Sequence, residues 1–264
     1  RKSKPSRIEG SLVVRCWSGL RMDGTPRHAR KPICFGPSAL KPSSTNWPCW
    51  SLSSNSTAPS RSSPVRPTTA IEWIVKITRE FFQRDPRICS RELIGCELLW
   101  NGAGGVIVET EAYSVRNDEA CHTFHRPSSR AFVCEKPPGT AYVYLKYGMY
   151  WLLNFLVTGG AEDGFVLIRA LEPTRGMEEM RQRRGVAEMK NLCSGPGKLT
   201  RALGINGDFH GRDIFESPGL MLILPSDPPE ILEGPRIGIS RSAELPWRFT
   251  KAGSRFLSAP MKAP

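Results

Sequence analysis

The sequence predicts a mixed α+β fold: one domain, residues 71–258, built around a curved antiparallel sheet with flanking helices and preceded by a disordered tail, residues 1–70. Two observations predict this fold. Apolar, β-rich segments follow one another through short Gly- and Pro-containing turns, with helical patterns at the flanks. The first 70 residues are rich in Ser and Pro and carry +10 of the net charge of +12, which leaves the domain nearly neutral.

A tail of this composition buries too little apolar surface to offset the entropy of ordering it. Its three Trp and three Cys are unusual for such a tail, and a non-coding origin of this stretch is the alternative. Because most of the excess charge lies there, the basic composition by itself gives only weak support for a polyanionic partner.

The first expected elements lie on either side of Asp85-Pro86. The pattern of Trp73, Ile77 and Phe81 predicts a helix over 72–82 that ends at Asp85-Pro86. A second short helix or strand then covers 89–99, and a turn follows at 102–105. Further along the chain we expect a turn at 137–139, strands over 106–113, 140–147, 150–157 and 165–171, and helices over 175–184 and 198–203.

Several function classes are disfavoured. The most apolar stretch, 141–160, contains Lys146 and Asn154, so no run reaches the length of a membrane span. The eight Cys form no CxxC pair, which argues against a zinc ribbon and favours reduced thiols inside the cell. His122 and His125, flanked by Cys121 and Cys134, match no common zinc spacing, so we expect no metal and place His122 in a polar pocket.

Strict alternation over 106–113 places Glu109, Glu111 and Tyr113 on one face of a strand, with Ile107 beside them. Two carboxylates and a ring suit the wall of a polar pocket in which one carboxylate acts as a general base. A solvent-facing strand edge is the alternative and has about equal weight on the pattern alone.

Residues 194–198, Ser-Gly-Pro-Gly-Lys, lack the spacing of a nucleoside-triphosphate loop. Free N–H groups at Gly195 and Gly197, with Lys198 nearby, suit a DNA phosphate at a helix start. A plain helix N-terminus is the alternative.

Aromatic residues gather between 142 and 151. Tyr147 falls at a turn made by Gly148, where its ring projects outward and suits wedging into a duplex. Tyr142, Tyr150 and Trp151 are assigned to core packing. Asn154 is polar within an apolar run, and a buried amide needs a partner or a ligand.

Four motifs in order resemble the alkyladenine (3-methyladenine) DNA glycosylases, and the likeness runs from about Phe81 to about Phe249. They are Val108-Glu-Thr-Glu-Ala-Tyr113, Ala141-Tyr-Val-Tyr-x-x-Tyr-Gly-Met-Tyr150 leading to Asn154, Leu167-Ile-Arg-Ala-Leu-Glu-Pro173 and Ser194-Gly-Pro-Gly-Lys-Leu199.

The resemblance implies a monofunctional glycosylase that flips and excises 3-methyladenine, 7-methylguanine or hypoxanthine from double-stranded DNA, as a monomer without a cofactor. It implies a role for each matched residue. Glu111 would be the general base that activates water, Arg169 would hold that water and carboxylate, and Tyr147 would be the wedge. Tyr113, His122 and Tyr144 would contact the flipped base, and Asn154 would disfavour the exocyclic amine of guanine.

The chain departs from the family between Arg126 and Lys136, which puts substrate range and affinity in question. A nonenzymatic nucleic-acid-binding module and a formyltransferase-like domain are the other hypotheses. Glu111 argues against a pure binder, because a carboxylate repels phosphate, and the tyrosine wedge would be unexplained in a formyltransferase-like domain. A glycosylase would act in the nucleus of a eukaryote or in the cytoplasm and nucleoid of a bacterium.

Overall fold

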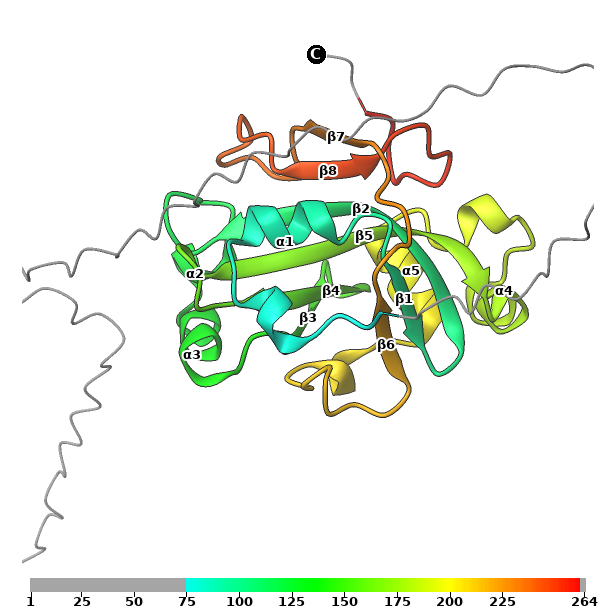
Figure 1. Cartoon of the computed structure of the whole chain (residues 1–264), viewed down its shortest axis with the longest axis horizontal. Coiled ribbons are helices and arrows are strands. Elements are labelled where there is room, and N and C mark those ends of the chain that lie inside the picture. Colours follow the sequence, from blue (N-terminus) through cyan, green and yellow to red (C-terminus); the bar gives the residue numbers. More distant parts are fainter. Residues whose placement is uncertain (1–74, 262–264) are drawn as a thin grey trace, which may run out of the picture. The chain divides into compact units, whose positions relative to one another are not determined.

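The structure, a computed structural model, describes residues 75–261. The predicted tail of residues 1–70 and the proposed domain start at residue 71 lie outside the described residues. An antiparallel sheet with flanking helices forms the described part, as the sequence predicts (Figure 1). No helix among residues 75–261 is long and apolar enough to cross a membrane.

The sheet has the strand order β3-β4-β5-β2-β1-β6, and β8 pairs with both β2 and β7. Every pairing is antiparallel. The hairpin of β7 and β8 lies along β2 at one side of the sheet (Figure 1). The strands are β1 (Glu97–Trp100), β2 (Ala103–Ser114), β3 (Ala141–Lys146), β4 (Tyr150–Val157), β5 (Gly164–Arg175), β6 (Leu220–Ile223), β7 (Ile231–Gly234) and β8 (Arg248–Lys251).

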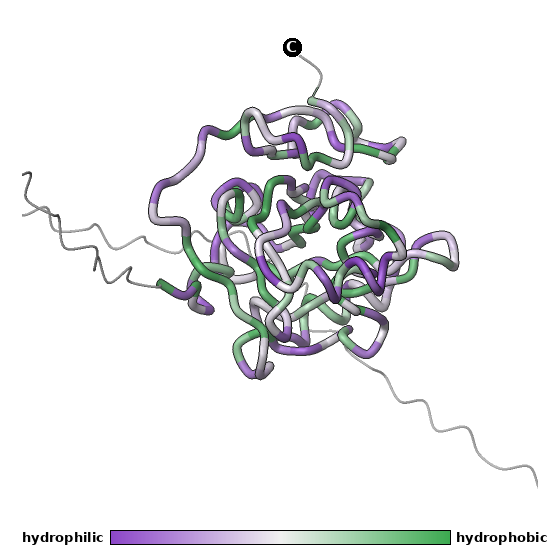
Figure 2. The backbone as a smooth tube through the Cα atoms, turned by 90° about the vertical axis from the view of Figure 1, so that its right-hand side faces the viewer, coloured by the Kyte–Doolittle hydropathy of each residue, from purple (hydrophilic) through white to green (hydrophobic). Residues whose placement is uncertain are grey.

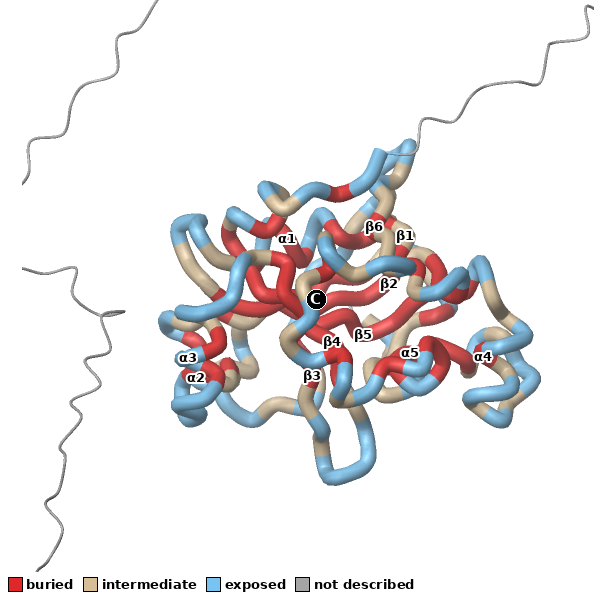
Figure 3. Tube along the Cα trace, turned by 90° about the horizontal axis from the view of Figure 1, so that it is seen from below, coloured by how far each residue is buried: buried red, intermediate tan, exposed pale blue. Residues whose placement is uncertain are grey.

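Helices cover the sheet and close its core. The helices are α1 (Pro86–Glu92), α2 (His122–His125), α3 (Pro127–Glu135), α4 (Met177–Arg184) and α5 (Pro196–Leu203). The main core packs α1 and α5 against the strands, and a second cluster packs Phe132 of α3 against Tyr142 and Phe165. Apolar segments concentrate in the interior (Figure 2), and the middle strands β2, β4 and β5 are almost wholly buried (Figure 3).

The helix predicted over 72–82 is wrong for the described residues. Lys76 forms a β-bridge with Ile223, and only Arg79–Phe82 form a short 3-10 helix. Asp85-Pro86 begins a helix instead of ending one. Asp85 accepts a hydrogen bond from the Arg87 N–H at 2.8 Å and Pro86 occupies the first helical position, the arrangement preferred at a helix start.

The strict alternation predicted over 106–113 is also wrong, because β2 and β5 each bulge. Ile107 pairs with Leu171 and Glu109 with Ala170, so Val108 has no opposite residue; Arg169 is skipped on β5 in the same way. The extra residues change which face the side chains take. Ile107 therefore joins the main core, whereas Val108 packs with Phe256 on the face that carries Glu109 and Glu111.

The helix cap gives a prediction about stability. We expect Asp85→Ala to lower the free energy of unfolding by about 1 kcal/mol at neutral pH, the usual cost of a lost N-cap. Hydrogen bonds from Arg87 lower the pKa of Asp85. The wild-type advantage should therefore be lost as the pH falls through that lowered pKa. Urea denaturation from pH 7 to pH 3 measures this, with Asp85→Asn as the variant that keeps a capping oxygen. An equal difference at both ends of the range would contradict the assignment.

Candidate active site

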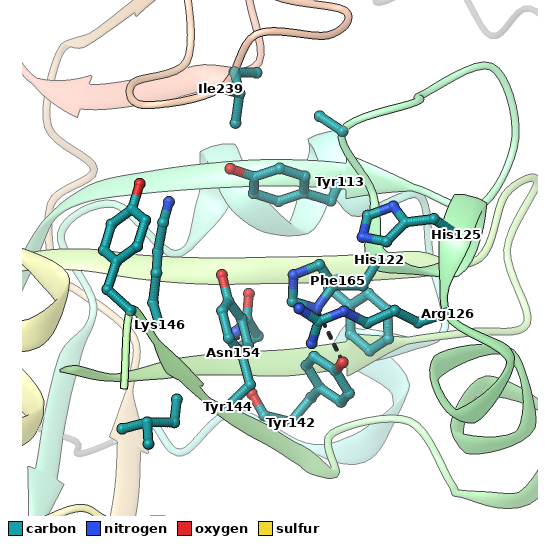
Figure 4. Close-up of a pocket in the computed structure, with 13 residues that line it drawn as sticks. Tyr113, His122, His125, Arg126, Tyr142, Tyr144, Lys146, Asn154, Phe165 and Ile239 are labelled. Atoms are coloured by element: carbon teal, nitrogen blue, oxygen red, sulfur yellow. Dashed lines mark hydrogen bonds between the residues drawn. The ribbon is translucent and has the colours of Figure 1, made fainter. Parts of the chain in front are cut away.

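A pocket of about 330 Å³ opens between β2, β3, α2 and the loop that precedes β8. A volume of this size suits a small ligand. Its residues come from segments far apart in the sequence, and Figure 4 shows them around one open space. They are Tyr113, Ala120, His122, His125, Arg126, Tyr142, Tyr144, Leu145, Lys146, Tyr147, Asn154, Phe165 and Ile239.

Rings form most of the pocket wall. Tyr113 lies on one side of the space, across from Tyr144 and His122 (Figure 4). The rings of His122 and Tyr144 are 4.3 Å apart between centroids and tilted by 59°. The structure therefore places in a single pocket four residues that the sequence analysis predicted as site residues: Tyr113, His122, Tyr144 and Asn154. Flat aromatic walls of this kind suit a planar, partly aromatic ligand.

His122 is held as a neutral imidazole. Its Nδ1 lies 3.0 Å from the Tyr142 hydroxyl, which also contacts the Ser129 hydroxyl at 2.7 Å. Burial lowers the pKa of His122 to about 4, and the nearby cations Arg126 and Lys146 contribute in the same direction. At neutral pH the ring therefore offers one donor and one acceptor rather than a charge.

Asn154 is buried on β4, and its amide nitrogen donates to the Tyr142 carbonyl at 3.1 Å. The bond meets the expectation that a buried amide finds a partner. It also fixes the orientation of the amide at the pocket wall. Tyr142, assigned from sequence to core packing, is buried but lines the pocket as well.

Glu111 lies directly behind the wall. It is fully buried and is not itself among the lining residues. One carboxylate oxygen accepts from the Tyr113 hydroxyl at 2.8 Å, and the other accepts from the backbone N–H of Ile237 at 2.7 Å. The Arg169 guanidinium lies 3.2 Å away. Glu111 is therefore linked to the pocket through Tyr113 and is oriented from three directions.

Arg169 joins the two glutamates that the sequence placed side by side. Its Nε donates to Glu109 at 2.8 Å, while its Nη1 pairs with Glu111. Burial by itself lowers the pKa of Arg169, but the negative charges of Glu111 and Glu109 outweigh this effect, so the pKa of Arg169 is raised. Glu109 is further bound by Arg248 at 2.9 Å and by the backbone N–H of Ser258 at 2.6 Å. The alternative of a solvent-facing strand edge is excluded, because both carboxylates are fully buried.

The charged side chains that line the pocket are cationic. Arg126 and Lys146 are among the lining residues, and none of the described residues that line the pocket is acidic. Arg126 begins the segment in which the chain departs from its family resemblance, so this departure reaches the pocket directly. His125, Arg126, Phe165 and Ile239 were not predicted as site residues, because they lie outside the four recognised motifs. Lys146 was also not predicted, because it occupies a position of the second motif at which no particular residue is specified.

Tyr147 lies at the tip of the β3–β4 hairpin. It has φ 55° and is 76% exposed, and Gly148 follows with φ 68°. Two successive residues in the left-handed region make a tight turn that holds the ring outward, as the sequence predicts. Lys146 lies over the ring, 5.3 Å from its centroid. Tyr150, which was expected in the core, is 51% exposed beside this tip.

The predicted phosphate-binding residues are not among the residues that line this pocket. Gly195 caps α5, and Lys198 donates to the Ser194 hydroxyl at 3.4 Å. Gly197 packs against the Tyr150 ring so closely that an added Cβ would lie 2.9 Å from the Tyr150 Cβ. Gly197 and Lys198 line a second cleft with Arg184 and Arg201. Among residues 75–261, no group of three or more His, Cys, Asp or Glu could hold a metal.

Comparison with known proteins gives a consistent result. A family model described as methylpurine-DNA glycosylase matches residues 80–255. A protein of Nitrosospira multiformis is 48% identical over 175 residues, which cover 66% of this chain and 90% of that protein. A protein of Rhizobium etli is 49% identical over 184 residues, covering 70% and 89%. Both relatives are named, provisionally, as 3-methyladenine DNA glycosylases.

The buried imidazole gives a prediction about pH. With its pKa lowered to about 4, His122 should remain neutral at pH 5.5, where a free histidine is mostly charged. Between pH 6.5 and pH 4 the His122 ring therefore binds a proton more readily in the unfolded chain than in the folded one. The free energy of unfolding should decrease as the pH falls through this range. NMR titration of the His122 ring should give a midpoint near 4, with the signal assigned by its loss in His122→Gln. A midpoint near 6.5 would contradict this account.

Proposed function

The chain belongs to the methylpurine-DNA glycosylase family, and on that premise we propose that its aromatic pocket holds an alkylated or deaminated purine that has been rotated out of duplex DNA. Glu111 and Arg169 then serve the hydrolysis of its N-glycosidic bond. The single observation that carries the proposal is the buried Glu111 carboxylate, bound to Tyr113 directly behind the pocket wall.

Glu111 is the general base in this proposal. It accepts a proton from a water molecule as the water oxygen bonds to the sugar C1′. The bond from C1′ to the purine nitrogen breaks, its electron pair leaves with the base, and an intact abasic site remains. Arg169 pairs with Glu111 and orients that carboxylate.

The wall rings and polar groups select the base. Tyr113 stacks on one face of the purine, and Tyr144 and His122 contact the other. Asn154, fixed by its bond to the Tyr142 carbonyl, meets the edge of the base and disfavours the exocyclic amine of guanine. The substrates we propose are 3-methyladenine, 7-methylguanine and hypoxanthine. Removal of such a base requires extrusion, which costs least for damaged or mispaired bases.

The remaining contacts position the duplex. Tyr147 fills the gap left by the extruded nucleotide, while Gly195, Gly197 and Lys198 at the start of α5 bind a backbone phosphate. The catalytic domain spans residues 71–258 and acts as a monomer, in the nucleus of a eukaryote or in the cytoplasm and nucleoid of a bacterium. A protein that only bound nucleic acid would have no use for a fully buried carboxylate bound to the wall of an aromatic pocket, as Glu111 is through Tyr113.

The proposal is tested at Glu111. We expect Glu111→Gln to slow single-turnover release of 3-methyladenine or hypoxanthine by about 10²–10⁴-fold, the usual value of general-base catalysis. Binding to a duplex with an abasic-site analogue should change little. Glu119→Gln, at an exposed carboxylate, is the matched control. Release by Glu111→Gln within a few-fold of wild type would remove the general base from the account.

The wedge is tested at Tyr147. We expect Tyr147→Ala to lower the fraction of DNA in which the damaged nucleotide is extruded, and with it the excision rate. The stacking of a base on an aromatic side chain contributes about 1–3 kcal/mol, and this determines the expected size of the loss. The defect should be large for a lesion in a stable pair and smaller for the same lesion in a bulge, where unpairing is already cheap. Tyr147→Phe keeps the ring and should behave as wild type. Equal losses in both contexts, with no change in the fluorescence of a reporter base, would show that Tyr147 is not the wedge.

A further inference from the structure

One loop closes the pocket from the side of β8. It runs from Arg236 to Trp247, and both ends are bound to β2 at Ala112, the residue after Glu111. Arg236 donates to the Ala112 carbonyl at 3.0 Å, and the Ala112 N–H donates to the Trp247 carbonyl at 2.9 Å. Ile239 from this loop lines the pocket, across from Tyr144 (Figure 4).

A buried ion pair holds this loop to the segment between β2 and α2. The Arg236 guanidinium bonds both oxygens of Asp118, at 2.6 and 2.8 Å, and both side chains are fully inaccessible to solvent. Two parallel bonds fix the relative orientation of two planar groups, which a single bond does not. We call this pair the Asp118–Arg236 clamp.

Asp118 extends the clamp towards His122. Its carboxylate accepts from the backbone N–H groups of Ser114 at 3.2 Å and of Ala120 at 3.1 Å. Its carbonyl accepts from the Cys121 N–H at 3.1 Å. Ala120 lines the pocket and His122 follows one residue after Cys121, so the position of Asp118 sets this part of the wall.

Arg236 extends the clamp towards Glu111. The next residue, Ile237, donates its N–H to the Glu111 carboxylate at 2.7 Å. The Arg236 guanidinium also lies over the Tyr113 ring, 4.6 Å from its centroid, and Tyr113 donates its hydroxyl to the same carboxylate. Two of the groups that orient Glu111 therefore depend on where Arg236 is held.

We infer that Asp118 and Arg236 are positioning residues for the reaction, because their clamp sets the direction of the Glu111 carboxylate through Ile237 and Tyr113. This inference rests on the proposed role of Glu111. Neither residue lines the pocket, so neither touches the base. A displacement of about 1 Å at a reacting group lowers the rate by up to about 100-fold. Loss of the Asp118–Arg236 clamp should therefore lower the rate by up to this amount.

The test is Arg236→Lys, which keeps the charge and removes the two-bond fork. Single-turnover release of 3-methyladenine from a duplex is measured at saturating enzyme, with the active fraction determined by titration. We expect release to slow by about 10- to 100-fold. Affinity for a duplex with an abasic-site analogue should stay close to wild type, because the groups that contact DNA remain.

Arg241→Ala is the matched control. Arg241 pairs with Glu119 between the same two segments, but at 3.6 Å and in solvent, where an ion pair contributes little. It should release base at the wild-type rate. If Arg236→Lys does not fold, the double variant Asp118→Asn with Arg236→Gln is used instead. It removes both buried charges together, so no unpaired charge is left in the interior.

A second measurement separates positioning from general loss of structure. Residues that act through Glu111 should have no further effect once that carboxylate is gone, so Arg236→Lys should not slow the residual release of Glu111→Gln. Additive losses would overturn the inference, as would a wild-type rate in Arg236→Lys or in the double variant. Failure of the wild-type protein to release base would instead overturn the proposed function.

Discussion

The burial of two carboxylates on one strand is the constraint on which the rest of the site depends. Glu109 and Glu111 are both fully buried on β2. Removing an ion from water costs several kcal/mol unless charges and hydrogen bonds compensate for it. Here the compensation comes from β5, β8, the loop after β7 and the segment after β8, through Arg169, Arg248, Ile237 and Ser258. The site therefore forms only when these distant segments have assembled.

The two carboxylates are bound differently. Glu109 accepts from Arg169, Arg248 and both the N–H and hydroxyl of Ser258, so it holds the chain segments together. Glu111 is bound by Ile237 and by Tyr113, whose ring forms the pocket wall. The bulges at Val108 and Arg169 make this arrangement possible, because they place Arg169 within reach of both carboxylates. One strand thus supplies both a structural carboxylate and one next to the ligand space.

Sequence patterns correctly predicted those features of the fold that are determined by residues close together in the chain. The β3–β4 hairpin, the outward Tyr147 and the start of α5 follow from turn chemistry and apolar alternation. The β-bulges were missed because nothing in the alternating residues of 106–113 marks them. Asp118 and Arg236 were missed for another reason: they are 118 residues apart, and each alone resembles an ordinary charged loop residue. A buried pair of this kind is visible only once the chain has folded.

The central claim is that Glu111 activates the attacking water. It is tested most directly by a crystal structure with a duplex that carries a methylpurine nucleoside stabilised by 2′-fluorination. The account predicts the base between Tyr113 and Tyr144, with one water in contact with both the Glu111 carboxylate and the sugar C1′. A base bound in the pocket while Glu111 remains closed off from water and sugar would contradict it.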